Sequence, residues 1–444
     1  MKIELSGHYT IRRLLLSSLP NVLMMIVSSI YSIVDGLFVS NWAGTTPFAA
    51  LNIIWPGLMV VAALGLMIGT GGSALVSMTM GQGDKERADR LFSMLIRFAF
   101  LLGVVFAVPM FLFMRPIAIA LGAEGELIKD AVIYGRILAA ALPFFILQMA
   151  FQSFYMTAEK PRLGTILSIV CGLTNMVLDA LFIVGFHWGI AGAAAATAMA
   201  QLVGGAWPLW YFTSKRNTSS LHLSKTGWDG KALLHACTNG LSEYVGNIAL
   251  SIVGMCYNLQ LMRYIGENGV AAYGIIMYIG FVFAAIFIGY NLTVAPVVGF
   301  NYGAQNHAEL RSLLRKSLTL MSIAGLVMTA ISEAASRPMS AIFVSYDADL
   351  MALTVRAQRL YMLSFLLCGI NMFTSAWFTA LGNGVVSAIA AFTRTLVFEL
   401  GAVFILPMVL GIDGIWMAVN VAEVLACILS ISLLFAFRKR YHYT

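Results

Sequence analysis

The chain has 444 residues, of which 60% are hydrophobic and only 11% are charged. A soluble domain has about 45 to 50% apolar and about 25% charged residues, so this composition excludes a soluble globular fold. The net charge of +7 does not indicate a nucleic-acid partner, because the basic residues cluster in short segments between apolar runs and not on one polar face.

Apolar segments long enough to cross a membrane recur along the whole chain, since a spanning helix needs about 20 apolar residues. Met1 to Tyr9 leads directly into the first segment without a signal-peptide cleavage site, so this segment is expected to stay in the membrane. The sequence predicts an all-α polytopic membrane protein of about twelve transmembrane helices. The predicted spans are 14–39, 51–80, 94–118, 132–157, 163–185, 190–213, 233–262, 270–300, 316–336, 357–381, 386–409 and 415–437.

The segments between these spans differ in positive charge. With the N-terminus inside, nineteen Lys and Arg residues fall in inner segments and five in outer segments. Positively charged loops are retained in the cytoplasm, so both termini are predicted to be cytoplasmic.

The two halves of the sequence superpose with a shift of 220 to 222 residues, and Gly69 to Gly83 falls on Gly289 to Gly303. Recurring close-packing glycines alone would not keep one register across several helices. The repeat predicts two six-helix bundles, residues 1–213 and 232–444, joined by a cytoplasmic linker at 214–231. An even number of spans per unit gives a parallel repeat, a transporter plan with a central cavity between the halves.

Acids inside predicted spans are candidates for function, because a charge at the bilayer centre costs about 2.5 to 3.5 kcal/mol. Asp35 falls near the outer end of the first span and Asp179 about two turns from the outer end of the fifth. Asn175 lies one turn below Asp179 on the same face, and Thr197 returns to a similar depth.

These four side chains are expected to meet in the outer half of the first bundle. Their hard oxygens suit a proton or Na⁺, and two close carboxylates resist ionising together. No other metal is expected. Two structural alternatives remain: Asp35 could reach the membrane interface from a helix end, or the group could be a purely structural polar cluster.

The second bundle contains three acids. Glu243 either lines a cavity or reaches cytoplasmic water, and Glu399 lies one turn from Arg394, which allows a structural ion pair or a substrate contact. Glu423 has no evident partner in the sequence.

Pro20 lies in the first predicted span. It removes a backbone hydrogen bond and bends the helix, either permanently or in response to protonation of Asp35.

Soft and aromatic side chains in a cavity would suit varied apolar cations. Candidates to line such a cavity are Glu243, Gln152, Met176 and Tyr257.

The five cysteines show no CxxC spacing, so neither a disulfide framework nor a zinc site is expected. No GxxxxGK[ST] phosphate-binding loop occurs, so no ATP and no other cofactor is expected.

Two stretches resemble bacterial multidrug and toxic compound extrusion (MATE) transporters: YSIVDGLFVSNWAG around Asp35, and TNMVLDALFIVGFHWGIAGAAAATAMAQ from Thr174 to Gln201. The duplicated plan with a basic middle linker is similar as well, so the resemblance covers essentially the whole chain. It implies a cation-coupling site made of Asp35, Asn175, Asp179 and Thr197, with Tyr134 as the tyrosine of the same network.

Some branches of that family place acids on helices 7 and 10 of the second bundle. Glu243 would match the first of these, whereas Tyr361 to Leu381 contains no carboxylate. A cation site in the second bundle is therefore not expected.

The sequence and the resemblance together predict a monomeric, H⁺- or Na⁺-coupled antiporter of the bacterial inner membrane, with membrane lipid and small organic cations as its partners. It would export amphipathic organic cations by alternating access.

Two other functions are weighed against it. A flippase for a lipid-linked sugar would need a strongly cationic central cavity, and only Arg136, Arg359 and Arg394 are embedded. A membrane-embedded enzyme would need a catalytic set, and no HExxH, no GxSxG and no paired histidines occur.

Overall fold

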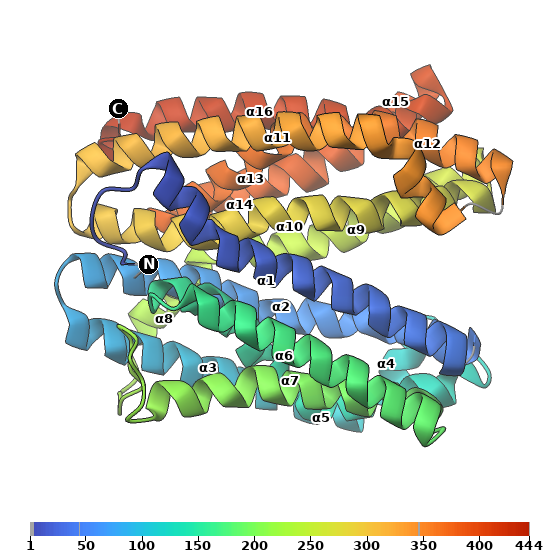
Figure 1. Cartoon of the computed structure of the whole chain (residues 1–444), viewed down its shortest axis with the longest axis horizontal. Coiled ribbons are helices and arrows are strands. Elements are labelled where there is room, and N and C mark those ends of the chain that lie inside the picture. Colours follow the sequence, from blue (N-terminus) through green and yellow to red (C-terminus); the bar gives the residue numbers. More distant parts are fainter. Residues whose placement is uncertain (1–3, 44, 345–346, 444) are drawn as a thin grey trace.

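The computed structural model describes residues 4–43, 45–344 and 347–443, and this part of the chain contains helices and no strands (Figure 1). The first half consists of α1 (Ile11–Phe38), η1 (Val39–Ala43), α2 (Thr45–Gly81), α3 (Lys85–Leu112), α4 (Met114–Ala120), α5 (Leu127–Thr157), α6 (Pro161–Asp179), η2 (Ala180–Gly185) and α7 (Gly189–Thr213). The second half consists of α8 (Gly230–Asn239), α9 (Leu241–Tyr264), α10 (Glu267–Gly303), α11 (His307–Val344), α12 (Ala348–Met362), α13 (Phe365–Ala380), α14 (Gly384–Phe392), η3 (Thr393–Glu399), α15 (Leu400–Leu410) and α16 (Ile412–Tyr441).

Among the described residues, eleven helices are long and apolar enough to cross a membrane. The helices α12 and α13 meet at an angle of 46°, and counting this bent pair as one span gives twelve. The predicted polytopic all-helical fold is confirmed.

Several predicted boundaries are wrong. The predicted span 233–262 is divided into α8 and α9 at Gly240, and the predicted span 94–118 covers the end of α3 and the separate short helix α4. In contrast, the predicted span 386–409 matches the apolar stretch Gly384–Leu410, which contains the π-helical turn η3. Gly240 explains the first error, because an added Cβ there would overlap the backbone of Met67 in α2. Only glycine permits so close an approach between α2 and the turn between α8 and α9.

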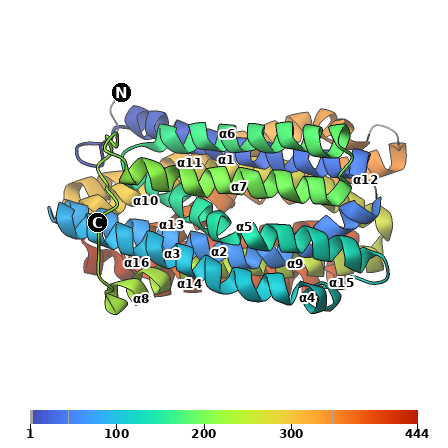
Figure 2. The same ribbon diagram turned by 90° about the horizontal axis from the view of Figure 1, so that it is seen from below.

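The helices run roughly parallel to one long axis and form two groups (Figures 1 and 2). Helices α2 to α7 lie together, and α9 to α16 lie together. Helix α1 lies between the groups, where it packs against α6 on one side and α10 on the other. The coil 214–229 connects the halves, and both termini lie at one end of the molecule.

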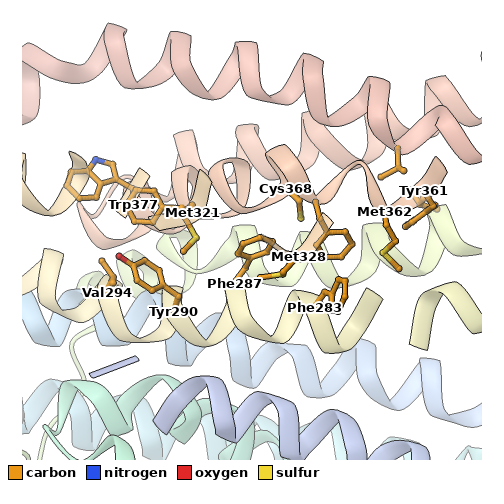
Figure 3. Packing of buried hydrophobic residues seen from close by; sticks show 14 of the residues in the cluster. Phe283, Phe287, Tyr290, Val294, Met321, Met328, Tyr361, Met362, Cys368 and Trp377 are labelled. Atoms are coloured by element: carbon orange, nitrogen blue, oxygen red, sulfur yellow. The ribbon is translucent and has the colours of Figure 1, made fainter. Parts of the chain in front are cut away.

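Each half has its own buried apolar cluster. In the second half, side chains of α10 such as Phe283 and Phe287 face Tyr361, Met362 and Cys368 of α12 and α13 (Figure 3). These aromatic and sulfur-containing side chains fill the interior of the second group.

The segment before α1 contacts the second half of the chain. Glu309 of α11 accepts a hydrogen bond from the Tyr9 backbone N–H (2.8 Å) and lies 2.6 Å from the His8 ring. The Lys316 ammonium donates to the Tyr9 carbonyl (2.6 Å). These contacts link the start of α1 to α11 at the end of the molecule where the termini lie.

Candidate functional site

Three helices of the first half bring polar side chains together inside the protein. Asp35 lies near the end of α1, Asn175 and Asp179 lie one turn apart on α6, and Thr197 lies on α7. Asn175, Asp179 and Thr197 are buried, and Asp35 is half-buried. The group lies toward the end of the molecule opposite the termini (Figure 1).

The acids of this group are neighbours in space. The Asp35 carboxylate lies beside that of Asp179 and beside the Asn175 amide. The Asn175 amide donates a hydrogen bond to the Thr197 hydroxyl at 3.4 Å. The structure therefore brings together the four residues that the sequence grouped by depth; the task they perform stays a prediction.

Tyr134 of α5 completes the cluster. Its ring is buried, and its hydroxyl is close enough to Asp35 and Asp179 for an electrostatic interaction with both. The Tyr134 hydroxyl makes no hydrogen bond to either carboxylate within the described parts of the chain, so its interaction with the acids is electrostatic.

Several oxygens of the cluster are unpaired. With both acids ionised, no hydrogen-bond partner exists among the described residues for either Asp179 carboxylate oxygen, for Oδ1 of Asp35, for Oδ1 of Asn175 or for the Tyr134 hydroxyl. A proton on one of the two acids would allow a hydrogen bond between them. Buried polar atoms are normally hydrogen-bonded, and an unpaired one costs about 1 to 3 kcal/mol. A cation that enters the cluster would satisfy these oxygens. Carboxylate, amide and hydroxyl oxygens can coordinate Na⁺, and a carboxylate can also take up a proton.

Asp179 ends the regular part of α6, because the six residues after it form the π-helical turn η2. Such turns occur often at functional sites, since they rotate the side chains of a helix out of their regular order.

Helix α1 continues through Pro20 from Ile11 to Phe38. Proline has no backbone N–H, so the helical hydrogen bond to the carbonyl of Leu16 is missing at this point. The Pro20 carbonyl accepts a hydrogen bond from the Thr165 hydroxyl of α6 at 2.6 Å. A weak point in α1 is therefore attached to the same helix that carries Asp179.

The second half holds a different polar network, which the sequence did not reveal. The Arg394 guanidinium of η3 donates two hydrogen bonds to one Glu423 oxygen of α16, the Nε contact measuring 2.8 Å. The Asn371 amide of α13 donates to the other Glu423 oxygen (2.6 Å), and Ser430 donates to Asn371 (2.9 Å).

This network corrects two interpretations. The proposed ion pair between Arg394 and Glu399 is wrong, because the guanidinium binds Glu423, for which the sequence suggested no partner. Arg394 and Glu399 are five residues apart in the π-helical turn η3, so they are not an i, i+3 or i, i+4 pair of a regular helix. The only signal in the sequence was that Asn371 and Glu423 are both polar residues inside apolar spans.

Glu399 lies near a group of three buried tyrosines. Tyr257 stacks on Tyr273 with ring centroids 4.8 Å apart, and Tyr361 meets both rings edge-on. Each of these tyrosines is close enough to Glu399 for an electrostatic interaction.

The four candidates for the substrate cavity do not form one site. Gln152, Met176 and Glu243 are half-buried on α5, α6 and α9, whereas Tyr257 is buried inside the second group. Glu243 and Tyr257 both belong to α9, and a helix rise of about 1.5 Å per residue separates them by about 21 Å along its axis. One small substrate cannot contact both.

The chain was compared with known proteins. The MatE family model matches twice, over residues 20–181 and 244–405. The multidrug export protein MepA of Staphylococcus haemolyticus is 25% identical over 424 residues, which cover 95% of this chain and 93% of that protein. A MepA of Staphylococcus aureus is 23% identical, with the same coverage.

Solved structures show the same fold. A crystal structure of MATE in complex with MaL6 matches with a TM-score of 0.93 and 23% identity over 99% of this chain and 98% of that one. The outward-facing conformation of a multidrug resistance MATE family transporter of the MOP superfamily matches with a TM-score of 0.92, the same identity and the same coverage. With a family model matched in both halves, the chain belongs to the MatE family of membrane transporters.

Proposed function

We propose that this protein is a multidrug efflux antiporter that exports amphipathic organic cations in exchange for H⁺ or Na⁺. The observation that carries the proposal is the acid pair Asp35 and Asp179 with its unpaired oxygens. The names of the MepA relatives support multidrug export as the process.

The coupling step follows from the cost of buried charge. Two neighbouring carboxylates inside a membrane bundle repel each other, and binding of a proton or Na⁺ removes part of that repulsion. Asp35 lies on α1, so a change in its charge alters how firmly the outer part of α1 is held against α6. Pro20 is the weak point at which α1 bends when this occurs. Bending reduces the space in the first bundle and releases the substrate outside.

We also propose how the protein is oriented in the membrane and that it acts as a monomer. Both termini lie in the cytoplasm of a bacterial cell, the protein is a monomer in the inner membrane, and the cluster faces the outer side. The excess of Lys and Arg in the inner segments supports this orientation. Gln152 and Met176 are proposed to contact the substrate in the first bundle, and Glu243 to attract its positive charge from the inner side.

The embedded arginines do not favour a lipid-linked sugar flippase. Arg136 donates to the Phe111 carbonyl, Arg359 to the Ser336 hydroxyl, and Arg394 to Glu423. Each guanidinium has its own partner in a different place, so they do not converge on a pyrophosphate.

Efflux of the cationic dye ethidium from proteoliposomes tests the proposal, with a proton gradient or a sodium gradient imposed separately. Asp35→Asn and Asp179→Asn keep the size of the side chains and remove their charge, so both are expected to abolish ion-driven efflux. Glu126→Gln, an exposed acid before α5, is the matched control and should transport normally. If Asp179→Asn exports the dye as the parent does, the coupling role is wrong. If the parent exports no cationic dye under either gradient, multidrug antiport is wrong.

A further inference from the structure

A basic hollow lies where α11 begins and α16 ends. These two helix ends lie at the end of the molecule that holds both termini (Figure 1). It has a volume of about 660 Å³. All the residues that line it are basic, and they are His307, Arg311, Arg438, Lys439 and His442. Three of them carry a permanent positive charge, and none of the lining residues is an acid. Like charges that share one hollow repel each other unless an anion separates them.

The donors of the basic hollow have no acceptor within the described parts of the chain. His307 Nδ1 is buried without a hydrogen-bond partner there. The nearest acid along α11 is Glu309, whose carboxylate is occupied by His8 and the Tyr9 backbone. An anion with several oxygens would satisfy this set of donors.

The backbone holds the basic hollow in shape. The chain leaves α16 at His442 in the left-handed conformation, with φ of 53°. This turn brings the His442 ring to 5.1 Å from the His307 ring, centroid to centroid. A non-glycine residue with positive φ is uncommon, so the reversal here is a specific feature of the fold.

An apolar stripe leads from the membrane to the basic hollow. Ile428, Ile431 and Phe435 are exposed on α16, with 46 to 60% of each residue accessible. Their spacing of three and four residues places them on one face of the helix, and Arg438 follows three residues later. The Arg438 guanidinium lies over the Phe435 ring, 5.4 Å from its centroid. The stripe and the basic hollow are therefore continuous.

We propose that the basic hollow binds the phosphate headgroup of an anionic phospholipid, whose acyl chain lies along Ile428, Ile431 and Phe435. Basic pockets beside transmembrane helices hold such headgroups through charge and hydrogen bonds. The enrichment of Lys and Arg in cytoplasmic segments explains why basic residues occur at this end of the protein. It does not explain why they line one hollow together. Arg315 shows the difference, because it is exposed one turn further along α11 and lies outside the basic hollow.

Native mass spectrometry of the full chain tests this proposal. The purified protein is titrated with phosphatidylglycerol, with phosphatidylcholine and, as a soluble phosphate, with glycerol 3-phosphate. Phosphatidylglycerol is expected to remain bound to the parent protein. Arg311→Gln should lower the affinity for this lipid about tenfold, because one charge-assisted contact is lost. Arg315→Gln removes the same charge from the same helix and should bind the lipid as the parent does. Phe435→Ala should weaken the binding of phosphatidylglycerol without changing the binding of glycerol 3-phosphate, because only the lipid has an acyl chain that contacts the ring.

Three results would overturn the proposal. Equal weakening by Arg315→Gln and Arg311→Gln would mean diffuse surface charge, and equal retention of phosphatidylcholine would mean that the headgroup charge is not recognised. Binding of glycerol 3-phosphate as tight as that of the lipid would assign the basic hollow to a soluble phosphate compound. If Arg311→Gln does not fold, Lys439→Gln replaces it in the same comparison.

Discussion

Gly81 and Gly303 end α2 and α10, and each packs against the backbone of the helix that carries the other. An added Cβ on Gly81 would overlap the Phe300 carbonyl oxygen, and one on Gly303 would overlap the Met78 carbonyl oxygen. Both carbonyls lie three residues before the opposite glycine. The two halves therefore meet in a symmetric crossing close to the end where the termini lie.

Gly303→Ala and Gly81→Ala are expected to force this crossing apart. Overpacking of a close contact costs about 1 to 3 kcal/mol, so each variant should unfold at a lower temperature in detergent. The matched control is Gly254→Ala on α9, where an added Cβ has open space and a helical alanine is preferred by about 0.5 to 1 kcal/mol. If all three variants unfold at the temperature of the parent, the crossing does not hold the halves together.

Tyr134→Phe should weaken ion coupling without destabilising the protein. The hydroxyl has no hydrogen-bond partner among the described residues, so its removal leaves no group unpaired. Loss of one hydrogen bond to a protonated carboxyl group costs about 0.5 to 1.5 kcal/mol, and loss of one oxygen ligand to Na⁺ acts in the same direction. The ion concentration for half-maximal efflux should therefore rise several-fold. Tyr155→Phe removes the hydroxyl of another buried tyrosine, near the opposite end of α5, and serves as the control. An equal change in both variants would contradict a specific role of Tyr134.

Arg394→Met is expected to destabilise the second half strongly. It leaves the buried Glu423 carboxylate without its cation, and breaking a buried pair from one side costs about 3 to 5 kcal/mol. Arg394→Met combined with Glu423→Gln removes both charges and should recover most of the lost thermal stability. The four variants of this cycle, compared by their unfolding temperatures, measure the coupling between the two side chains. Additive losses would show that the pair is not energetically linked.

Cys237 on α8 can report the contact between α8 and α2. Burial raises the pKa of its thiol, so less thiolate is present at neutral pH than for a free cysteine. In a variant whose other four cysteines are alanine, the rate of maleimide labelling should therefore rise at a higher pH than the rate for glutathione. Gly71 packs against the carbonyl of Ala236, next to Cys237. Gly71→Ala should loosen this contact and move the labelling profile toward lower pH; an unchanged profile would mean that α8 stays in place.

Much of the fold could be predicted because a membrane restricts a spanning segment to an apolar helix of a certain length. Apolar length alone defined most of the spans, and the repeat indicated their common plan. The errors fall where tertiary contacts act on a continuous apolar run. Gly240 separates α8 from α9 because α2 approaches it closely, and neither hydropathy nor length reports such a contact.

The candidate site was predictable to a similar degree, for a different reason. Asn175 and Asp179 lie one turn apart on one helix, so helical geometry alone placed them together, and the order of the spans placed Asp35 and Thr197 at the same depth. The pairing of Arg394 with Glu423 depends on how α16 is rotated against η3. The rotation of a helix about its own axis depends on how it packs against its neighbours, so it could not be predicted from the sequence.

The unpaired first-bundle acids also bear on the energy source. Among the described residues, neither Asp35 nor Asp179 forms an ion pair like that between Arg394 and Glu423, so under the proposed coupling the pair would accept up to two positive charges in each cycle. Entry of two protons against exit of one monovalent substrate would carry one net charge inward. Each such charge gains about 2.3 kcal/mol per 100 mV of membrane voltage. With both acids in use, export would be electrogenic and driven by voltage as well as by the ion gradient, whereas use of one acid would make it electrically silent.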